Sequence, residues 1–366
     1  MLKSFEAKNF RGFQDLTLRE LDRVNLIAGR NNVGKTALLE ALFIHSGSYH
    51  PELGLTVNAF RGIEEVRLEL GKTAEFPWNS LFTGFDTTKS IELHGEDTTE
   101  GTRVIRINEM LPDQALVGTK KVKKTKGSRL NLEQVSARAR ILRLQYEDKS
   151  GSSSYDLVFD LDPSDPKRTP YITPTPPNPP FPAFFLASRI RIPFEIEAEL
   201  FGRLEIQKGE QDILQFLQII EPNLKSLRLI YSMGKPIFHG DMDSDRLLPL
   251  PMMGEGMVRL LSFILRIANA PDGVVLIDEI ENGLHYSILP KLWSVIGKMA
   301  KKYNTQVFAT THSLECIKAA HQAFSNEDTY EFLVHRLQFS KNGDVHAVTY
   351  DREDLEAAFE IGIEVR

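Results

Sequence analysis

Hydrophobic residues recur at two different periods along the chain, and the period changes from segment to segment. Residues 2–8 and 15–27 have the pattern of two strands, the second ending in the apolar run VNLIAG. A helix is expected over 35–43, and residues 51–90 are expected to form short helices and loops. Four later segments alternate as strands of an antiparallel sheet do: SIELHG, VIRIN, RILRLQYED and YDLVFDLD.

The second half of the chain changes from strands to helices. Residues 163–182 are rich in proline and predict an extended connector, followed by a buried strand in AFFLASRI. Residues 194–220 are expected to be helical, and LRLIYSMGKPIFHG is expected to form a hairpin. From Met257 onward helices alternate with the strands VVLIDE and QVFATT, which is typical of a parallel, helix-covered sheet.

These elements predict an α/β fold with a mostly parallel sheet, an antiparallel β lobe and a small helical lobe. Sustained heptads are missing from the roughly 220 residues between the first loop and the later motifs, so no long coiled coil is expected. We expect a single head over 1–366. Its predicted lobes are 1–95, a β insertion at 96–165, a connector and helical lobe at 166–245, and a final lobe at 246–366.

Composition places the chain among ordinary globular proteins. It has 366 residues, of which 42% are hydrophobic and 26% charged, and a net charge of -6. The single cysteine, Cys316, excludes an internal disulfide and fits a reducing compartment. The start MLKSFEAKNF has no apolar signal core, and no segment approaches the ~20 apolar residues of a membrane span. We therefore expect a cytoplasmic protein whose acidic balance argues against coating nucleic acid over its whole surface.

The stretch GRNNVGKT carries the strongest chemical signal. It matches G-x-x-x-x-G-K-[ST] at Gly29, Gly34, Lys35 and Thr36, between a predicted strand and a predicted helix. Glycines let backbone N–H groups approach phosphate oxygens, and the helix adds its positive N-terminal end. Lys35 is expected to reach the β- and γ-phosphates, and Thr36 to bind Mg²⁺. The remaining nucleotide-contacting candidates are Arg30, Asn31, Asn32, Val33 and Ala37.

Two carboxylates follow a strand of buried character in VVLIDE. Asp278 is suited to hold Mg²⁺ together with Thr36. Glu279 would lie nearer the γ-phosphate and orient or deprotonate the attacking water. An acidic pair after four apolar residues is common by itself. The loop at Gly29–Thr36 in the same chain supports its assignment to a nucleotide site. The pair favours hydrolysis of a nucleotide over binding alone.

The segment TTHS follows the next predicted strand, QVFA. A histidine at that strand end would face the γ-phosphate, so His312 is expected to donate a hydrogen bond to phosphate or water. Ser313 also suits the N-cap of the helix LECIKAAHQAF. Both roles are compatible.

Five motifs in this order resemble the ABC-type ATPase heads of the SMC/RecF class. They are NFRGF, GRNNVGKTALLEAL, GEGMVRLLSFIL, VVLIDEIENGLHYSILPKLW and QVFATTHSLECI. More narrowly, the chain resembles the compact AAA-annotated ATPases allied to the OLD family. The resemblance covers about 1–45 and 245–366. It implies ATP and Mg²⁺ as ligands and a nucleotide sandwiched between two heads.

The resemblance also assigns residues to that interface. Gly254, Glu255 and Gly256 occupy the signature position and would open a helix toward the γ-phosphate of the opposite head. The family's usual signature serine is replaced by Gly254. Asn282 and His285 follow in IENGLH, either acting across the interface or belonging to a capped loop.

Four further residues are assigned more loosely by the resemblance. Arg11 is placed close to the nucleotide, with a surface turn as the alternative. The polar residue that relatives carry between the P-loop and the signature has no clear counterpart. Its candidates are Ser188, Arg189 and Gln145.

A basic segment lies between the predicted antiparallel strands. Six positive charges fall within about ten residues, which suits either contact with a phosphate backbone or a solvated hairpin tip, and the tip is favoured. The segment has no interleaved aromatic residues for base stacking. DMDSDR lacks the rest of a calcium loop and predicts a polar turn. The basic residues are Lys120, Lys121, Lys123, Lys124, Lys126 and Arg129.

The resemblance implies an ATPase that works as a homodimer or higher homo-oligomer and transmits its nucleotide state to a separate effector protein, in phage defence. The alternative is a RecF-like, DNA-binding ATPase of repair or recombination, and DNA binding by the basic segment would distinguish the two. An ABC transporter motor fits less well, because no membrane partner is suggested. The C-terminal EDLEAAFEIGIEVR is expected to form an amphipathic helix that packs on its own head or docks elsewhere.

Overall fold

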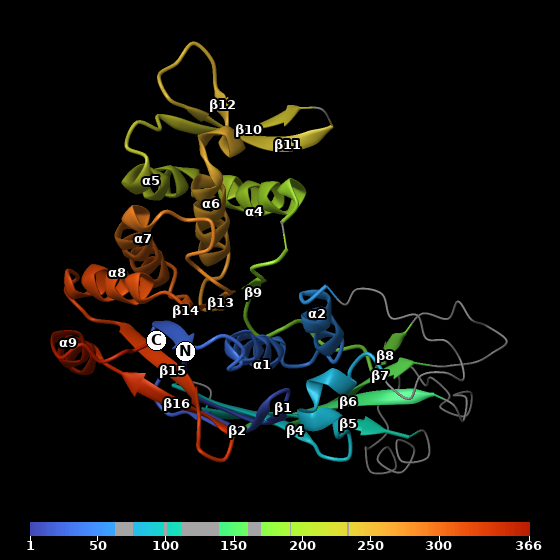
Figure 1. The fold of residues 1–366 in the computed structure, drawn as a ribbon. Coiled ribbons are helices and arrows are strands. Elements are labelled where there is room, and N and C mark those ends of the chain that lie inside the picture. The colour runs from blue at the N-terminus through green and yellow to red at the C-terminus, as the bar shows by residue number, and fades with distance from the viewer. Residues whose placement is uncertain (63–75, 99–100, 112–138, 160–169, 191, 233) are drawn as a thin grey trace. The chain divides into compact units, whose positions relative to one another are not determined.

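The computed structural model describes residues 1–62, 76–98, 101–111, 139–159, 170–190, 192–232 and 234–366 (Figure 1). These residues form two compact units. Unit 1 comprises Met1–Ser4, Leu18–Leu39 and Phe181–Arg366, and unit 2 comprises Phe5–Thr17 and Glu40–Pro180. The basic segment at 120–129 lies outside the described residues. The four predicted lobes stay a prediction.

Unit 1 is built on a six-stranded sheet of order β16-β15-β3-β14-β13-β9. Neighbouring strands from β15 to β9 are parallel, and β16 is antiparallel to β15. Strands β3 and β13 are buried at every residue, as expected where both faces of a parallel sheet are covered. The strands are β3 (Val24–Gly29), β9 (Ala183–Leu186), β13 (Val274–Ile277), β14 (Gln306–Thr310), β15 (Phe332–Phe339) and β16 (Val345–Tyr350).

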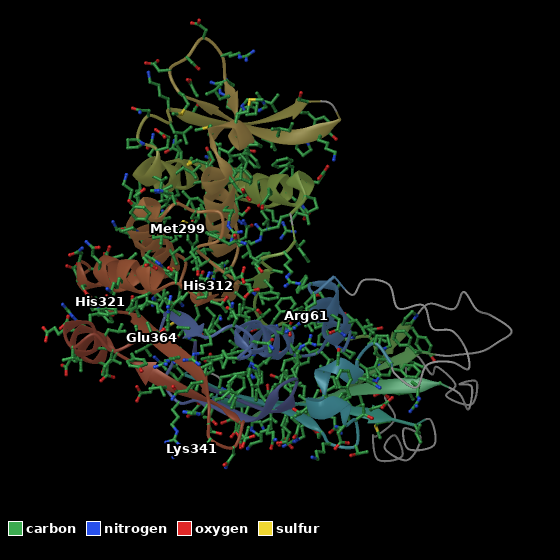
Figure 2. All side chains as sticks on the ribbon, in the orientation of Figure 1. Arg61, Met299, His312, His321, Lys341 and Glu364 are labelled. Carbon is green, nitrogen blue, oxygen red and sulfur yellow. The ribbon has the colours of Figure 1, made fainter. Side chains whose placement is uncertain are left out.

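Helices of unit 1 share one hydrophobic core with this sheet. Helices α7 and α8 pack side by side (Figure 1), and Met299 of α7 is fully buried among the side chains drawn in Figure 2. The helices are α4 (Phe194–Ile206), α5 (Glu210–Ile220), α6 (Glu255–Ala268), α7 (Leu289–Lys302), α8 (Leu314–Ser325) and α9 (Arg352–Glu360). None of these helices exceeds 14 residues, which agrees with the expected absence of a coiled coil in the described part of the chain.

A small lobe of unit 1 combines α4 and α5 with a three-stranded sheet. The predicted hairpin is confirmed as β10 (Ser226–Ser232) and β11 (Lys235–Asp241), followed by β12 (Leu248–Pro249). The rings of Phe201 in α4 and Phe238 in β11 meet edge to face, with centroids 5.2 Å apart. The C-terminal helix α9 packs on α8 and β16, and Val365 beyond it is buried in the core of this unit.

Unit 2 contains a seven-stranded sheet of order β2-β1-β4-β5-β6-β7-β8. The strands from β4 to β8 are antiparallel, as the alternating pattern of β4 to β7 predicted. The strands are β1 (Leu2–Phe10), β2 (Phe13–Leu18), β4 (Ile91–Asp97), β5 (Gly101–Met110), β6 (Arg140–Asp148), β7 (Gly151–Phe159) and β8 (Tyr171–Thr173). Helix α1 (Lys35–Gly47) crosses from unit 1 into unit 2, and α2 (Leu53–Ala59) lies in unit 2. Short 3-10 turns occur at Asn79–Leu81 and Thr83–Phe85, within the region expected to form short helices and loops.

Two sequence-based expectations about strands were wrong. Residues 15–27 form two strands in different sheets, because Asp22 and Asn25 fix a turn between them: Asn25 Nδ2 donates to the Asp22 carbonyl and the Asp22 N–H donates to Asn25 Oδ1. The segment 183–190 is only partly buried, since β9 forms the edge of the six-stranded sheet among the described residues, next to β13. The described part of the proline-rich connector behaves as expected, with β8 at a sheet edge.

Candidate functional site

The loop after β3 is shaped by residues with positive φ. Gly29 has φ 141°, Asn32 has φ 67° and Gly34 has φ 105°. A Cβ atom at Gly29 would lie 2.5 Å from the carbonyl oxygen of Leu337, so only glycine fits there. The chain then enters α1 at Lys35, which leaves the free N–H groups of that helix facing the loop.

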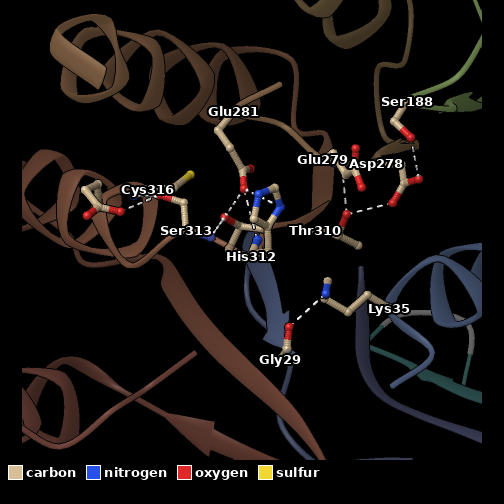
Figure 3. A network of polar contacts seen from close by, with 12 residues as sticks. Gly29, Lys35, Ser188, Asp278, Glu279, Glu281, Thr310, His312, Ser313 and Cys316 are labelled. Carbon is tan, nitrogen blue, oxygen red and sulfur yellow. Dashed lines mark hydrogen bonds and ion pairs between the residues drawn. The ribbon is translucent and has the colours of Figure 1, made fainter. Parts of the chain in front are cut away.

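Lys35 lies across this loop. Its Nζ donates a hydrogen bond to the carbonyl oxygen of Gly29 at 2.8 Å (Figure 3). It donates another to the carbonyl oxygen of Arg30 at 3.1 Å. Burial lowers the pKa of Lys35, and the carboxylates of Asp278, Glu279 and Glu281 oppose that shift. The Lys35 ammonium is therefore partly buried and lies near the three carboxylates of Asp278, Glu279 and Glu281.

Asp278 follows β13 and is buried, with 5% of its surface exposed. Three hydroxyls surround its carboxylate: Thr36 Oγ1 at 3.1 and 3.2 Å, Ser188 Oγ at 3.1 Å and Thr310 Oγ1 at 2.7 Å. They come from α1, from the segment after β9 and from the end of β14, which the parallel strand order brings together. Figure 3 shows Ser188 and Thr310 on either side of the Asp278 carboxylate. Carboxylate and hydroxyl oxygens are the hard ligands that Mg²⁺ prefers, so these residues fit that ion.

Glu279 has φ 49°, a left-handed conformation that is uncommon for a residue with a side chain. Its main chain is held on both sides. The backbone N–H donates to Thr310 Oγ1 at 2.8 Å, and the carbonyl accepts from Arg259 Nη2 at 3.2 Å. The guanidinium of Arg259 also lies over the ring of Phe263, at 5.5 Å from its centroid. Thr310 and Arg259 therefore fix the backbone of Glu279, and that backbone sets the direction in which the Glu279 carboxylate points.

His312 lies just beyond β14, with 54% of its side chain exposed. Its Nδ1 is 3.2 Å from Glu281 Oε1, and the same oxygen accepts from the His312 backbone N–H at 2.9 Å and from Thr311 Oγ1 at 2.8 Å. Ser313 caps α8 by accepting from the Cys316 N–H, as its sequence position predicted.

The signature segment begins α6. Gly254 is exposed at the N-cap with φ 108° and ψ 152°, and Glu255 and Gly256 form the first turn. A Cβ at Gly283, in the loop after Glu279, would lie 3.4 Å from Glu255 Cδ, so the two segments are adjacent. Asn282 is exposed, and the exposed His285 caps a short turn by accepting from the Ser287 N–H.

A cavity of about 460 Å³ lies next to this site within unit 1. Its wall includes Ser188 and Arg259, which contact Asp278 and the Glu279 carbonyl respectively. Apolar side chains supply much of the remaining wall, including Phe194 and Phe263. The cavity therefore adjoins two groups that hold the acidic residues in place.

The loosely assigned residues have different surroundings. Ser188 contacts Asp278, whereas Arg189 is exposed nearby. Gln145 is exposed on β6 of unit 2. Arg11, also in unit 2, is not the surface residue of the alternative: it forms an ion pair with Glu40 and donates to Asn58 Oδ1 at 2.9 Å. Its proximity to nucleotide stays a prediction.

Three residues of this site were not found from the sequence: Arg259, Glu281 and Thr310. Thr310 and Glu281 stand within the motifs TTHS and DEIEN, beside residues that were singled out. Their polar side chains at strand ends were the available signal. Arg259 sits in the first turns of a mostly apolar helix, where nothing local distinguishes it from a surface arginine.

Comparisons with known proteins identify a family and several similar proteins. Residues 24–317 match the family described as "AAA domain, putative AbiEii toxin, Type IV TA system". A Helicobacter pylori protein named "ATP/GTP phosphatase" is 24% identical over 389 residues, covering 98% of each chain. An uncharacterized Methanocaldococcus jannaschii protein is 48% identical over 42 residues, which is 12% of this chain and 19% of that one.

Solved structures give the fold. The crystal structure of an SMC head bound to the C-winged helix domain of ScpA superposes with a TM-score of 0.50 and 12% identity, over 97% of this chain and 99% of that chain. Within the described ranges, no helix combines enough length and hydrophobicity to cross a bilayer. The chain belongs to the AAA-domain family matched by residues 24–317, and it is a P-loop ATPase with the fold of an SMC head.

Proposed function

We propose that the site built on Gly29–Ala37 binds ATP with Mg²⁺ and that two copies of the chain close around the nucleotide. One observation carries the proposal. The Thr36 hydroxyl lies 3.1 Å from the Asp278 carboxylate, although 242 positions separate them, and Lys35 lies on the same loop. A hydroxyl, a carboxylate and an ammonium converge at the N-terminus of α1, as a magnesium–triphosphate site requires.

Each residue then has a definite task. The backbone N–H groups of the loop and Lys35 hold the phosphates, while Thr36 and Asp278 hold Mg²⁺. Mg²⁺ held by Thr36 and Asp278 would supply positive charge that neutralises the charge developing on the phosphates. Ser188 and Thr310 donate hydrogen bonds that keep the Asp278 carboxylate oriented.

Glu279 is the proposed general base. Its backbone is held by Thr310 and Arg259, so its carboxylate can be kept near the attacking water, from which it takes a proton. His312 is proposed to contact the γ-phosphate or that water, because it follows β14, the strand between β13 and β3. Arg11 stays a candidate for contact with the nucleotide.

The second copy is proposed to supply the N-terminus of α6. Gly254 and Glu255 are exposed at the start of α6, and the positive end of a helix favours a phosphate. The conformation of Gly254, with φ 108°, is one that residues with a side chain rarely adopt. Backbone N–H groups, rather than a serine hydroxyl, are therefore proposed to meet the γ-phosphate.

Nucleotide-dependent closure is proposed to act on a separate effector protein. The support is the matched family, whose description names a putative toxin of a Type IV TA system. A role in phage defence is proposed from the sequence resemblance to ATPases of that kind. The alternative, DNA binding in the manner of RecF, depends on the basic segment at 120–129. Replacing Lys120, Lys121, Lys123 and Lys124 with Ala tests it, since DNA-stimulated turnover should then disappear.

The central test compares Glu279→Gln with Lys35→Ala. We expect Glu279→Gln to keep ATP binding and lose turnover by about 10³-fold or more, because only proton removal is affected. Lys35→Ala should lose binding of a fluorescent ATP analogue. ATP and GTP should both be assayed, since the Helicobacter pylori relative is named for both. Unchanged hydrolysis in Glu279→Gln would refute the assignment of the base.

The dimer is tested with the same variant. Glu279→Gln with ATP and Mg²⁺ should elute as a dimer in light-scattering chromatography, and a matched sample with EDTA should not. Gly254→Val should block the dimer while leaving ATP binding by the monomer intact, since a β-branched residue resists a positive φ. A monomer in every condition would refute closure around the nucleotide.

A further inference from the structure

Glu281 joins the loops that follow two different strands. It lies two residues beyond Glu279, in the loop after β13, and its side chain reaches the turn after β14. Only 10% of this side chain is exposed. A single oxygen, Oε1, accepts from Thr311 Oγ1 and from the His312 backbone N–H and also faces His312 Nδ1 (Figure 3).

The second oxygen of Glu281 is buried and has no hydrogen-bond partner among the described residues. A buried carboxylate oxygen in that condition costs stability, which a shorter side chain would avoid. The charge of the carboxylate does act on its surroundings, since it counters the effect of burial on the pKa values of Lys35 and Arg259. Closing the turn after β14 therefore does not by itself explain why position 281 carries a charged glutamate.

We propose that Glu281 is a positioning residue for the ATPase reaction, which holds the His312 ring with its proton on Nδ1. This inference rests on the proposed contact between His312 and the γ-phosphate or attacking water. A carboxylate facing Nδ1 fixes which nitrogen is protonated and how the ring is turned. Nε2 is then the nitrogen that meets the reaction, as a donor to phosphate in the charged ring or as an acceptor from water in the neutral ring.

A purely structural role makes a different prediction. The turn at Thr311–Ser313 needs only an acceptor for one N–H and one hydroxyl, and the oxygen of a glutamine amide supplies that. Glu281→Gln therefore keeps the acceptor and removes the charge that faces His312. Glu315 provides a matched control, because its carboxylate accepts from Ser313 Oγ in the same turn and is largely exposed.

The experiment is a double-mutant cycle in steady-state ATP hydrolysis by the full chain. We expect Glu281→Gln to lower kcat about tenfold with KM within about twofold, since orientation during the reaction is lost and ground-state binding is not. In the His312→Ala background the same change should lower kcat by less than about twofold, because Glu281 acts through the missing ring. Glu315→Gln should behave as wild type.

A second readout does not depend on activity. In ¹⁵N-histidine-labelled protein, the wild-type His312 ring should show a protonated Nδ1, and Glu281→Gln should move it to a mixture of tautomers. The inference is overturned if the kcat losses of Glu281→Gln and His312→Ala multiply in the double variant. It is also overturned if Glu281→Gln leaves the His312 spectrum unchanged. The inference is also overturned if Glu279→Gln abolishes turnover and Glu281→Gln leaves it unchanged. In that case the proposed function still stands. Failure of the wild type to hydrolyse ATP would instead refute the proposed function.

Discussion

Thr310 is the residue whose replacement tests the organisation of the site most directly. It is fully buried at the end of β14, where its hydroxyl donates to Asp278 Oδ1 at 2.7 Å and accepts from the Glu279 N–H at 2.8 Å. One oxygen atom thereby holds both acidic residues. Thr310→Val keeps the shape of the side chain and removes both hydrogen bonds.

The magnitude follows from these two bonds. A hydrogen bond to a charged group is worth about 1.5–3 kcal/mol, and a buried N–H left without a partner costs about 1–3 kcal/mol. The two losses share one oxygen and will not add fully. If the loss of orientation at Asp278 and Glu279 appears in the transition state, kcat falls about 10- to 100-fold, since about 1.4 kcal/mol corresponds to a factor of ten.

The assay pairs kcat for ATP hydrolysis with urea unfolding, and Thr305 supplies the control. Thr305 is equally buried, just before β14, and its hydroxyl donates to the carbonyl oxygens of Ala270, at 2.7 Å, and Ile267, at 3.2 Å. Thr305→Val should lower the free energy of unfolding by about 1 kcal/mol and leave kcat within about twofold. If Thr310→Val behaves like Thr305→Val in both measurements, the hydroxyl does not organise the site.

Three further outcomes concern stability and reactivity. Glu40→Ala should destabilise unit 2 by about 3–5 kcal/mol in urea unfolding, because the buried Arg11 loses its partner, whereas the half-exposed Arg61→Ala should cost about 1 kcal/mol or less. A comparable cost for both would contradict this. Burial lowers the pKa of His335 to about 4, so the folded state binds fewer protons than the unfolded state and stability should fall by up to ~3 kcal/mol as the pH drops from 6.5 to about 4. His335→Gln should flatten that dependence, and an unchanged slope would contradict it. Burial raises the pKa of Cys316 to about 12, so its thiol should resist iodoacetamide at about pH 8 until the protein is unfolded. Rapid labelling of the native protein would contradict this.

Local pattern was enough for the elements whose geometry is set by their own residues. The glycine spacing in GRNNVGKT predicts the turn, and the structure shows positive φ at Gly29 and Gly34. The buried runs in β13 and β14 and the alternation in β4–β7 predict the two kinds of sheet. The one strand expected over 15–27 failed, because the Asp22–Asn25 turn consists of side-chain hydrogen bonds that no hydrophobic period reveals.

The P-loop, the acidic pair Asp278 and Glu279 and the α/β fold can be read from the sequence, because short-range dihedral preferences and burial set these features. What those residues touch follows from long-range folding. The contacts of Asp278 with Thr36, Ser188 and Thr310 require β9, β13, β14 and β3 to lie in that order. Strand order depends on pairing between distant segments, and it is this pairing that brings a carboxylate, three hydroxyls and the tie between Glu281 and His312 to one edge of the sheet.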